Sequence, residues 1–479
     1  MKDLEMVIGL EIHVQAKTNS KMFCRCDAKY FQSAPNSHVC PVCLGLPGAL
    51  PVPNKAAIEK CIKLSLALNC KINKFSKFDR KNYFYPDLPK GYQISQYDLP
   101  FGYDGYLEYD IHGDSHRIRI TRVHQEEDTG KSIHENNETK LDFNKSGVPL
   151  VEIVTEPDFS NVEEVNLFAK RLKQIVKYLD ISDADMEKGQ MRFELNISLR
   201  EAGTKKLPNY KVEIKNIGSI SVLEKVIKYE FERQSEILNN NETPIQETRG
   251  IKDMSGKTYS QRIKESSDDY RYFPEPDIPP IIFNDEQIKK IKSEIIELPQ
   301  EKKDRYIKDY GIEPSTAETI ISKKQKADWF EESIKDVKDV EVVKEIAKWF
   351  IGDVSALMKT KKIKLKDLKF KPTNLLKLVL MLKSGKVSGS IAKQILSAIF
   401  ETSEDPEEYA TKQNLLVIND DKAIEEVVIQ VIKDNPNVVK TVEKNPNAAK
   451  FLIGQVMRAT KGKANPKLAE SLINKHLGL

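Results

Sequence analysis

The carboxylate of Glu11 and the imidazole of His13 are the first pair in the chain whose types and spacing suit metal chemistry. They lie two residues apart in VIGLEIHV at 7–14, where every second residue is apolar. Such alternation predicts a half-buried strand, on which both side chains share a face, roughly 7 Å apart between Cα atoms. Both could reach one divalent ion, although an ordinary solvated strand face gives the same pattern.

Other carboxylates are available to complete such a site. The segment HQEEDTGKS places Glu126, Glu127 and Asp128 in a row, so at least one of them should lie on each side of a strand. Glu152 lies inside an apolar run, where an unpaired carboxylate is costly to bury. A mixed oxygen and nitrogen shell suits Mg²⁺ or Mn²⁺ better than a closed zinc site.

Four of the six cysteines form a second candidate metal site. Cys24 and Cys26 form a CxC pair, and Cys40 and Cys43 form a CPVC pair, with thirteen residues between the pairs. This spacing predicts a zinc knuckle at 24–43 with four thiolate ligands, and a redox pair is the competing interpretation. Four thiolates leave no open coordination position, so the zinc would be structural.

The elements around these residues predict an α+β fold, with helices and strands in separate runs. Possible capping boxes at Ser160 and Glu163, and at Ser221 and Glu224, each precede an amphipathic helix. Between the helices, alternation over 192–200 and 210–215 predicts an antiparallel strand pair with one apolar and one charged face. The charged face is either solvated or the floor of a cleft.

Two aromatic tracts stand out among the loops. Residues 77–98 interleave six aromatics with charged residues, and SDDYRYFPEPD at 267–277 is a similar tract. Rigid aromatic rings beside fixed charges suit a site for a nucleotide base or the end of an RNA strand. A packed connecting loop is the alternative. Proline residues after the second tract place a domain boundary near residue 293.

Composition and charge restrict the class of protein. The chain has 479 residues, 39% apolar and 31% charged, which is typical of a globular protein of roughly three domains. No secretory signal and no apolar stretch of membrane-spanning length are present, so we expect a cytoplasmic protein without a membrane partner. Residues 351–400 carry eleven lysines and residues 440–479 eight basic residues against two acidic ones. These basic blocks suit phosphate backbones, although a solvated lysine-rich surface is the alternative.

Several catalytic motifs are missing. TGKS at 129–132 resembles the end of a P-loop, but Gln125 stands where that motif requires glycine. The chain has neither a GxSxG nucleophile elbow nor a Ser/Gly-rich amidase tract with a catalytic lysine. If this protein consumes ammonia, another chain must generate it.

Long motifs in a fixed order carry a family resemblance. They are VIGLEIHVQAKTNSKMFC, KFDRKNYFYPD with YQISQYD, HQEEDTGKS, VEIVTEPD, SDDYRYFPEPD and, near the end, FLIGQVMRATKGKANP. Together they resemble the B subunits of the tRNA-dependent amidotransferases. The resemblance implies a cradle-shaped mixed α/β catalytic domain at 1–293, a helical domain at 294–404 and a helical tail domain at 405–479 that binds tRNA.

The resemblance also implies an activity and partners. In that family, ATP phosphorylates the side-chain carboxylate of Glu-tRNA(Gln) or Asp-tRNA(Asn), and ammonia then displaces phosphate to give Gln-tRNA(Gln) or Asn-tRNA(Asn). The expected partners are a glutaminase A subunit that delivers ammonia and a small C subunit. The expected cofactors are Mg²⁺, ATP as a substrate, and structural Zn²⁺. Some members lack the four cysteines, which argues for a structural role of the zinc.

By the same resemblance, residues can be assigned to roles. The expected magnesium ligands are Glu11, His13, Glu127 and Glu152, with Glu126 and Glu194 as further candidates. The expected catalytic residues are Glu11, His13, Glu127 and Lys81. The residues expected near ATP, ammonia or the aminoacyl end of the tRNA are Arg80, Lys81, Tyr83, Tyr85 and Glu194.

Two other classes of protein are alternatives to an amidotransferase. A metal-dependent RNA phosphodiesterase would cleave RNA without ATP, glutamine or partner subunits. A non-catalytic tRNA scaffold would keep its function when Glu11 or His13 is replaced.

Overall fold

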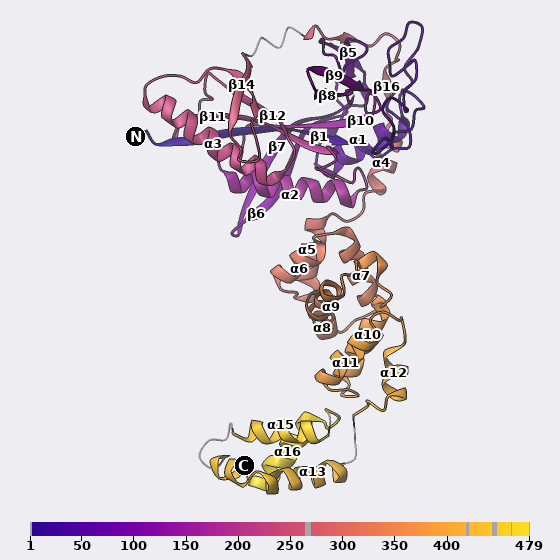
Figure 1. Ribbon diagram of the computed structural model, residues 1–479, viewed down its shortest axis with the longest axis vertical. Helices are drawn as coiled ribbons and strands as arrows, with labels where there is room; N and C mark the ends of the chain where they lie inside the picture. Colours follow the sequence, from indigo (N-terminus) through magenta and orange to yellow (C-terminus); the bar gives the residue numbers. More distant parts are fainter. Residues whose placement is uncertain (1, 264–269, 418–420, 443–447, 461, 479) are drawn as a thin grey trace. The chain divides into compact units, whose positions relative to one another are not determined.

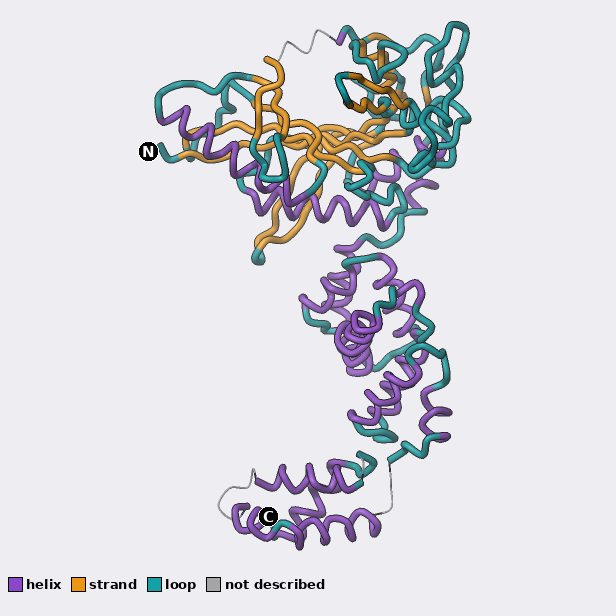
Figure 2. Tube along the Cα trace, in the orientation of Figure 1, coloured by secondary structure: helices purple, strands orange, loops and turns teal. Residues whose placement is uncertain are grey.

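The computed structural model describes residues 2–263, 270–417, 421–442, 448–460 and 462–478 (Figure 1). It divides into two compact units, Met1–Leu298 and Pro299–Leu479. The first is rich in strands and the second is helical among the described residues, which confirms the predicted α+β class (Figure 2).

A nine-stranded sheet organises the first unit, in the order β14-β13-β12-β11-β1-β10-β7-β6-β2. In chain order its strands are β1 (Leu4–Gln15), β2 (Lys71–Ile72), β6 (Gly102–Ile111), β7 (Asp114–Glu127), β10 (Pro149–Thr155), β11 (Met191–Glu201), β12 (Val212–Ile217), β13 (Glu247–Ile251) and β14 (Thr258–Ile263). The pairing is antiparallel except between β12 and β13.

Smaller sheets and four helices complete this unit. A three-stranded sheet contains β15 (Phe273–Pro274), β4 (Asp79–Asn82) and β5 (Tyr92–Ser95). Two-stranded sheets pair β3 (Phe75–Ser76) with β16 (Ile281–Ile282), and β8 (Lys131–Glu135) with β9 (Glu138–Asp142). The helices are α1 (Lys55–Ala67), α2 (Val162–Tyr178), α3 (Ile220–Asn239) and α4 (Asp285–Ser293).

Strand β1 lies inside the large sheet, between β11 and β10. The strand predicted over 7–14 is therefore present, and its even-numbered apolar residues Ile8, Leu10, Ile12 and Val14 are all buried in the main core. Helices α2 and α3 cover that face of the sheet (Figure 1). Because side chains alternate along a strand, Glu11 and its odd-numbered neighbours face the opposite side of the sheet.

The strand pair predicted between α2 and α3 is confirmed as β11 and β12, but both helices begin at other caps than predicted. Asn161, not Ser160, caps α2 by accepting a hydrogen bond from the backbone of Glu164 at 2.9 Å. Ser219, not Ser221, caps α3. Several small polar residues precede each helix, and any of them can accept from the first turn, so sequence alone did not determine the start.

A buried ion network joins α3 to β13 and β14. The fully buried Glu230 accepts hydrogen bonds from Arg233 at 2.8 Å and from Gln234 at 2.9 Å, and Arg249 lies 3.3 Å away. Burial alone would raise the pKa of Glu230, but the hydrogen bond and charge of Arg233 outweigh it, so the pKa lies below its usual value of 4.5. This carboxylate therefore holds the edge of the sheet in place.

We expect Glu230→Gln to lower the free energy of unfolding by about 2 kcal/mol, because it removes the buried charge that pairs with Arg233 and Arg249, although Glu247 still pairs with Arg249. The depressed pKa means that this contribution is present above pH 4.5 and is lost as the pH falls through the folded-state value. The difference in the free energy of unfolding between wild type and variant should therefore disappear at acid pH. Urea unfolding at neutral and acid pH tests this, with Glu232→Gln on the exposed side of α3 as the control; equal losses in both variants would contradict it.

The second unit contains only helices among its described residues. They are α5 (Pro299–Tyr310), α6 (Pro314–Ile321), α7 (Lys324–Ile334), α8 (Val340–Trp349), the π-helix η2 (Phe350–Val354), α9 (Ser355–Lys361), the 3₁₀-helix η3 (Leu365–Asp367), α10 (Pro372–Lys383), α11 (Gly389–Ile399), α12 (Pro406–Lys412), α13 (Asp421–Asp434), α14 (Pro436–Val442), α15 (Ala449–Ala459) and α16 (Pro466–Leu477). None of the helices in the described part of the chain is both long and apolar enough to cross a membrane.

This unit has two hydrophobic cores. One includes Ala410 and Leu415 together with residues of α5–α11, and the other consists of residues of α13–α16 such as Leu452 and Val456. Helix α12 thus packs with the preceding helices, and the last core begins at α13 rather than at residue 405.

Candidate functional site

The face of the large sheet that carries Glu11 gathers acidic residues and histidines from five neighbouring strands. Because β12, β11, β1, β10 and β7 follow one another in the sheet, equivalent positions lie in one row. In this row Glu11 pairs with Glu194, and His13 pairs with Glu152. The charged face predicted for β11 and β12 therefore belongs to the floor of this site, where Glu194 and Glu213 are buried.

One cluster centres on Glu152. The Nε2 atom of His13 lies 3.3 Å from Oε2 of Glu152 and 3.6 Å from Oε1 of Glu126. His124 Nε2 lies 3.4 Å from the same Glu152 oxygen. One ligand atom each from His13, Glu126 and Glu152 lies within 4.8 Å of the others, a spacing that one metal ion can bridge.

The charges in this cluster shift the pKa values of its members. Burial would lower the pKa of His13, but its hydrogen bond to Glu152 raises it overall. Burial would raise the pKa of Glu152, but His124 and His13 hold it well below its usual value. The Nδ1 atoms of both histidines are buried and have no hydrogen-bond partner among the described residues. The cluster therefore holds Glu152 in its anionic form, beside two histidines whose Nδ1 atoms have no such partner in the described part of the chain.

A second acidic cluster adjoins the first. Glu11, Glu194 and Glu213 each offer an oxygen within 4.8 Å of the others. The pKa of Glu11 is raised by burial and by the charges of Glu152 and Glu194. Asn196 donates a hydrogen bond to Glu11 at 2.9 Å, and Lys215 lies 3.4 Å from Glu194. Crowded carboxylates of this kind suit a hard cation.

The structure does not bring Glu127 into either cluster. The side chain of Glu127 accepts a hydrogen bond from the backbone of Ile94 at 2.9 Å and pairs with Lys90. Glu126, named above only as a further candidate, faces His13 instead. The reason is a β-bulge, because the register between β10 and β7 shifts between Val154 and Thr155. One extra residue on β7 reverses which side chains face each side.

Lys81 belongs to the first aromatic tract and lies beside tyrosine rings of both tracts. Its Nζ is 5.0 Å from the ring centre of Tyr270 and 5.9 Å from that of Tyr83. Burial would lower the pKa of Lys81, but Tyr272 and the carboxylates of Glu126 and Glu152 raise it well above its usual value. Lys81 is therefore a cation held by tyrosine rings close to the acidic clusters.

The other predicted residues of this loop have different surroundings. Arg80 is bound by Glu275 through two hydrogen bonds at 2.7 and 2.9 Å, so its guanidinium is already occupied. Tyr85 is exposed. Strand β15 pairs with β4, which places Phe273 opposite Arg80 and joins the tracts that are far apart in sequence.

Sequence reasoning missed three residues of this site. His124 lies two positions before Glu126 and therefore shares its face of the strand. This period of two could be recognised in the sequence HQEE. Glu213 required the pairing of β12 with β11, and Tyr270 required the pairing of β15 with β4. These two positions depend on contacts between distant segments.

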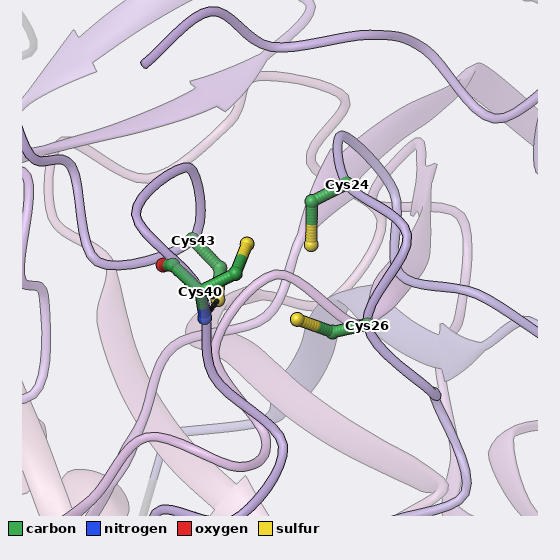
Figure 3. A group of neighbouring side chains, drawn as sticks. All are labelled: Cys24, Cys26, Cys40 and Cys43. Carbon is green, nitrogen blue, oxygen red and sulfur yellow. Dashed lines mark hydrogen bonds between the residues drawn. The ribbon is translucent and has the colours of Figure 1, made fainter. Parts of the chain in front are cut away.

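The four predicted cysteine ligands converge. Cys24 and Cys26 come from one loop and face Cys40 and Cys43 from another (Figure 3). Their sulfur atoms lie within 4.8 Å of one another, and the cysteines are free. A hydrogen bond from Cys24 lowers the pKa of the Cys43 thiol, which favours the thiolate that binds metal. The donor set and spacing fit a tetrahedral Zn²⁺ site.

Comparison with known families agrees with this geometry. Residues 6–289 match the model of the GatB/GatE catalytic domain, and residues 328–477 match the GatB domain. A protein of Thermotoga maritima is 45% identical over 479 residues, and one of Caldicellulosiruptor bescii is 44% identical over 481 residues, covering 98% and 99% of each chain. A protein of Persephonella marina is 43% identical, covering 99% of this chain and 100% of its own. All three are named as the B subunit of an aspartyl/glutamyl-tRNA(Asn/Gln) amidotransferase.

The fold and the acidic site thus define a chain with a GatB/GatE-type catalytic domain. The chain belongs to the family of aspartyl/glutamyl-tRNA(Asn/Gln) amidotransferase B subunits, as its motifs indicated.

Proposed function

We propose that this chain catalyses the ATP-dependent amidation of Glu-tRNA(Gln), Asp-tRNA(Asn) or both, as the B subunit of a complex with a glutaminase A subunit and a C subunit. The observation that carries the proposal is the end-to-end similarity to named B subunits, and the two acidic clusters on the face that carries Glu11 and His13 support it. The expected tRNA specificity and the cytoplasmic location rest on the same family relationship.

The acidic clusters supply the binding groups for the nucleotide metal. His13, Glu126 and Glu152 would hold one divalent ion, and Glu11, Glu194 and Glu213 offer oxygens for a second. When bound, Mg²⁺ would neutralise phosphate oxygens and align ATP with the carboxylate. The unpartnered Nδ1 of His13 and the anionic Glu152 fit such a centre.

Lys81 supplies fixed positive charge beside these clusters. None of the described residues accepts a hydrogen bond from its ammonium, so it is available to a phosphate. The substrate carboxylate attacks the γ-phosphorus of ATP, the bond to ADP breaks, and an acyl phosphate forms. Ammonia then attacks the carbonyl carbon, inorganic phosphate leaves, and the nitrogen loses a proton to give the amide. Lys81 stabilises negative charge on the phosphate in both steps.

The cysteine cluster is proposed to hold structural Zn²⁺ and to take no part in this chemistry. Its four sulfur ligands would fill the coordination sphere, so the metal would fix the loop at 24–43.

The test is amide formation on mischarged tRNA by the complete complex, with ATP and Mg²⁺ and with either glutamine or ammonium chloride. We expect product from ammonium chloride even when the glutaminase of the partner is inactivated, and no product with Glu11→Gln. Glu5→Gln is the matched control, because Glu5 lies on the same strand but pairs with Arg200. Normal turnover by Glu11→Gln would contradict the proposed site, intact tRNA binding without any product would indicate a scaffold, and cleaved tRNA would indicate a phosphodiesterase.

A further inference from the structure

Lys21 is a fully buried lysine at the base of the cysteine cluster. Its side chain has 0% exposure. The Nζ atom lies 3.6 Å from Sγ of Cys43 and 3.3 Å from the carbonyl oxygen of Phe143. The backbone N–H of Lys21 also donates to the carbonyl of Cys26 at 2.9 Å. The residue is therefore tied to both cysteine pairs.

A buried ammonium is costly unless an anion compensates it. Within the described parts of the chain, no carboxylate forms an ion pair with Lys21. A carbonyl oxygen is neutral, so the sulfur of Cys43 is the one contact of the ammonium that can carry a full negative charge.

The cysteine cluster with a bound metal would carry excess negative charge. A divalent metal with four thiolates carries a net charge of about −2, and a cluster at the edge of a core must offset that charge locally. Cys43 Sγ already accepts a hydrogen bond from the backbone of Cys40 at 3.2 Å. The lysine adds a charge-assisted donor to the same sulfur.

We propose that Lys21 is a positioning residue of the metal site, whose ammonium donates to the Cys43 thiolate and offsets the charge of the metal–thiolate centre. The inference rests on the proposed zinc site and goes beyond it, because it assigns a role to a residue that is not a ligand.

The packing around Lys21 supports this role. A Cβ atom at Gly147 would make ordinary van der Waals contacts, 3.4 Å from Cβ of Cys43 and 3.5 Å from Cδ of Lys21, so the backbone of Gly147 packs beside both side chains. Gly147 also has a φ of +83°, which a side chain would strain. The carbonyl of Gly147 accepts from the backbone of Met22 at 2.7 Å, which fixes the chain next to Lys21.

The first measurement is zinc affinity of the full chain by competition with a chromogenic chelator. Lys21→Met keeps the apolar stem and removes the charge, and Lys29→Met removes the same charge from an exposed position in the same loop. We expect Lys21→Met to weaken zinc binding about 10- to 100-fold, as loss of an outer hydrogen-bond partner typically does, and Lys29→Met to leave it unchanged. Equal affinity in wild type and Lys21→Met would overturn the inference.

The second measurement separates charge compensation from simple packing. Lys21→Met should lower the melting temperature more with zinc bound than in excess chelator, because only the bound metal holds all four sulfur atoms as thiolates. Equal lowering in both conditions would show a packing role only and would overturn the inference.

Two further results keep the test decisive. If wild type itself binds no zinc, the proposed zinc site is wrong, and the role of Lys21 is wrong with it. If wild type and Lys21→Met bind zinc with the same affinity, only the role of Lys21 is wrong. If Lys21→Met does not fold, the Cys43→Ser background is used, in which the lysine has already lost its thiolate. There Lys21→Met should increase stability, and a decrease would overturn the inference.

Discussion

Glu126→Gln is expected to lower amide formation on mischarged tRNA about 100- to 1,000-fold, the loss typical of removing one preorganised electrostatic group. Glu126 contributes a buried oxygen 3.6 Å from Nε2 of His13, and the amide of glutamine lacks the charge that attracts a cation. Binding of Mn²⁺, followed by electron paramagnetic resonance on the full chain, should weaken in parallel.

Glu127→Gln is the matched comparison, because it makes the same change one residue further along β7. Glu127 pairs with Lys90 and lies outside both acidic clusters, so its loss should leave Mn²⁺ binding unaltered. If Glu127→Gln loses the metal and Glu126→Gln keeps it, the ligand set predicted from the sequence is right and the one drawn from the geometry is wrong.

Removing residues 418–479 is expected to weaken tRNA binding by about ten-fold or more and to reduce its dependence on salt, since basic residues release counterions from phosphates. The deleted segment has a hydrophobic core of its own in α13–α16. Cutting after residue 417 also leaves Ala410 and Leu415 in the other helical core. Ammonia-dependent chemistry should therefore persist at saturating tRNA.

A charge variant separates the role of the basic residues from the loss of the whole tail. Lys450, Arg458 and Lys467 are exposed, and replacing all three by glutamine should reproduce much of the loss without disturbing the core. Filter binding at several salt concentrations measures both proteins. A truncated chain that binds tRNA as well as the full one would refute the assignment of the tail.

The parts of the fold that sequence predicted correctly are those with a local period. The alternation in VIGLEIHV gives β1 and the shared face of Glu11 and His13, because the period of a strand is independent of its partners. The spacing of the cysteines is likewise a local pattern, and the four sulfur atoms converge as expected.

Whether Glu126 or Glu127 faces His13 depends on a β-bulge in β7, which has no local signal in the sequence. Ile118 and Ile120 are buried, and continuing their alternation would place Glu127 on the polar side. The bulge on β7 moves the buried position to Val123 and turns Glu126 toward His13. The bulge is set by the pairing of β7 with β10, so only the assembled sheet reveals it.

The position of β1 inside the sheet also constrains how the protein is made. Strand β1 is synthesised before β10 and β11, and the last residue of β11 that pairs with it is Glu201. At ribosomal speeds of roughly 5 to 20 residues per second, β1 waits roughly 10 to 40 seconds for that partner.

Both edges of β1 lack their native partners until β10 emerges, and the edge that pairs with β11 lacks its partner for the whole interval, a condition that promotes pairing with other chains. The row of Glu11, His13, Glu152 and Glu194 forms only when the sheet closes around β1, so this acidic face is completed only after β11 has been synthesised.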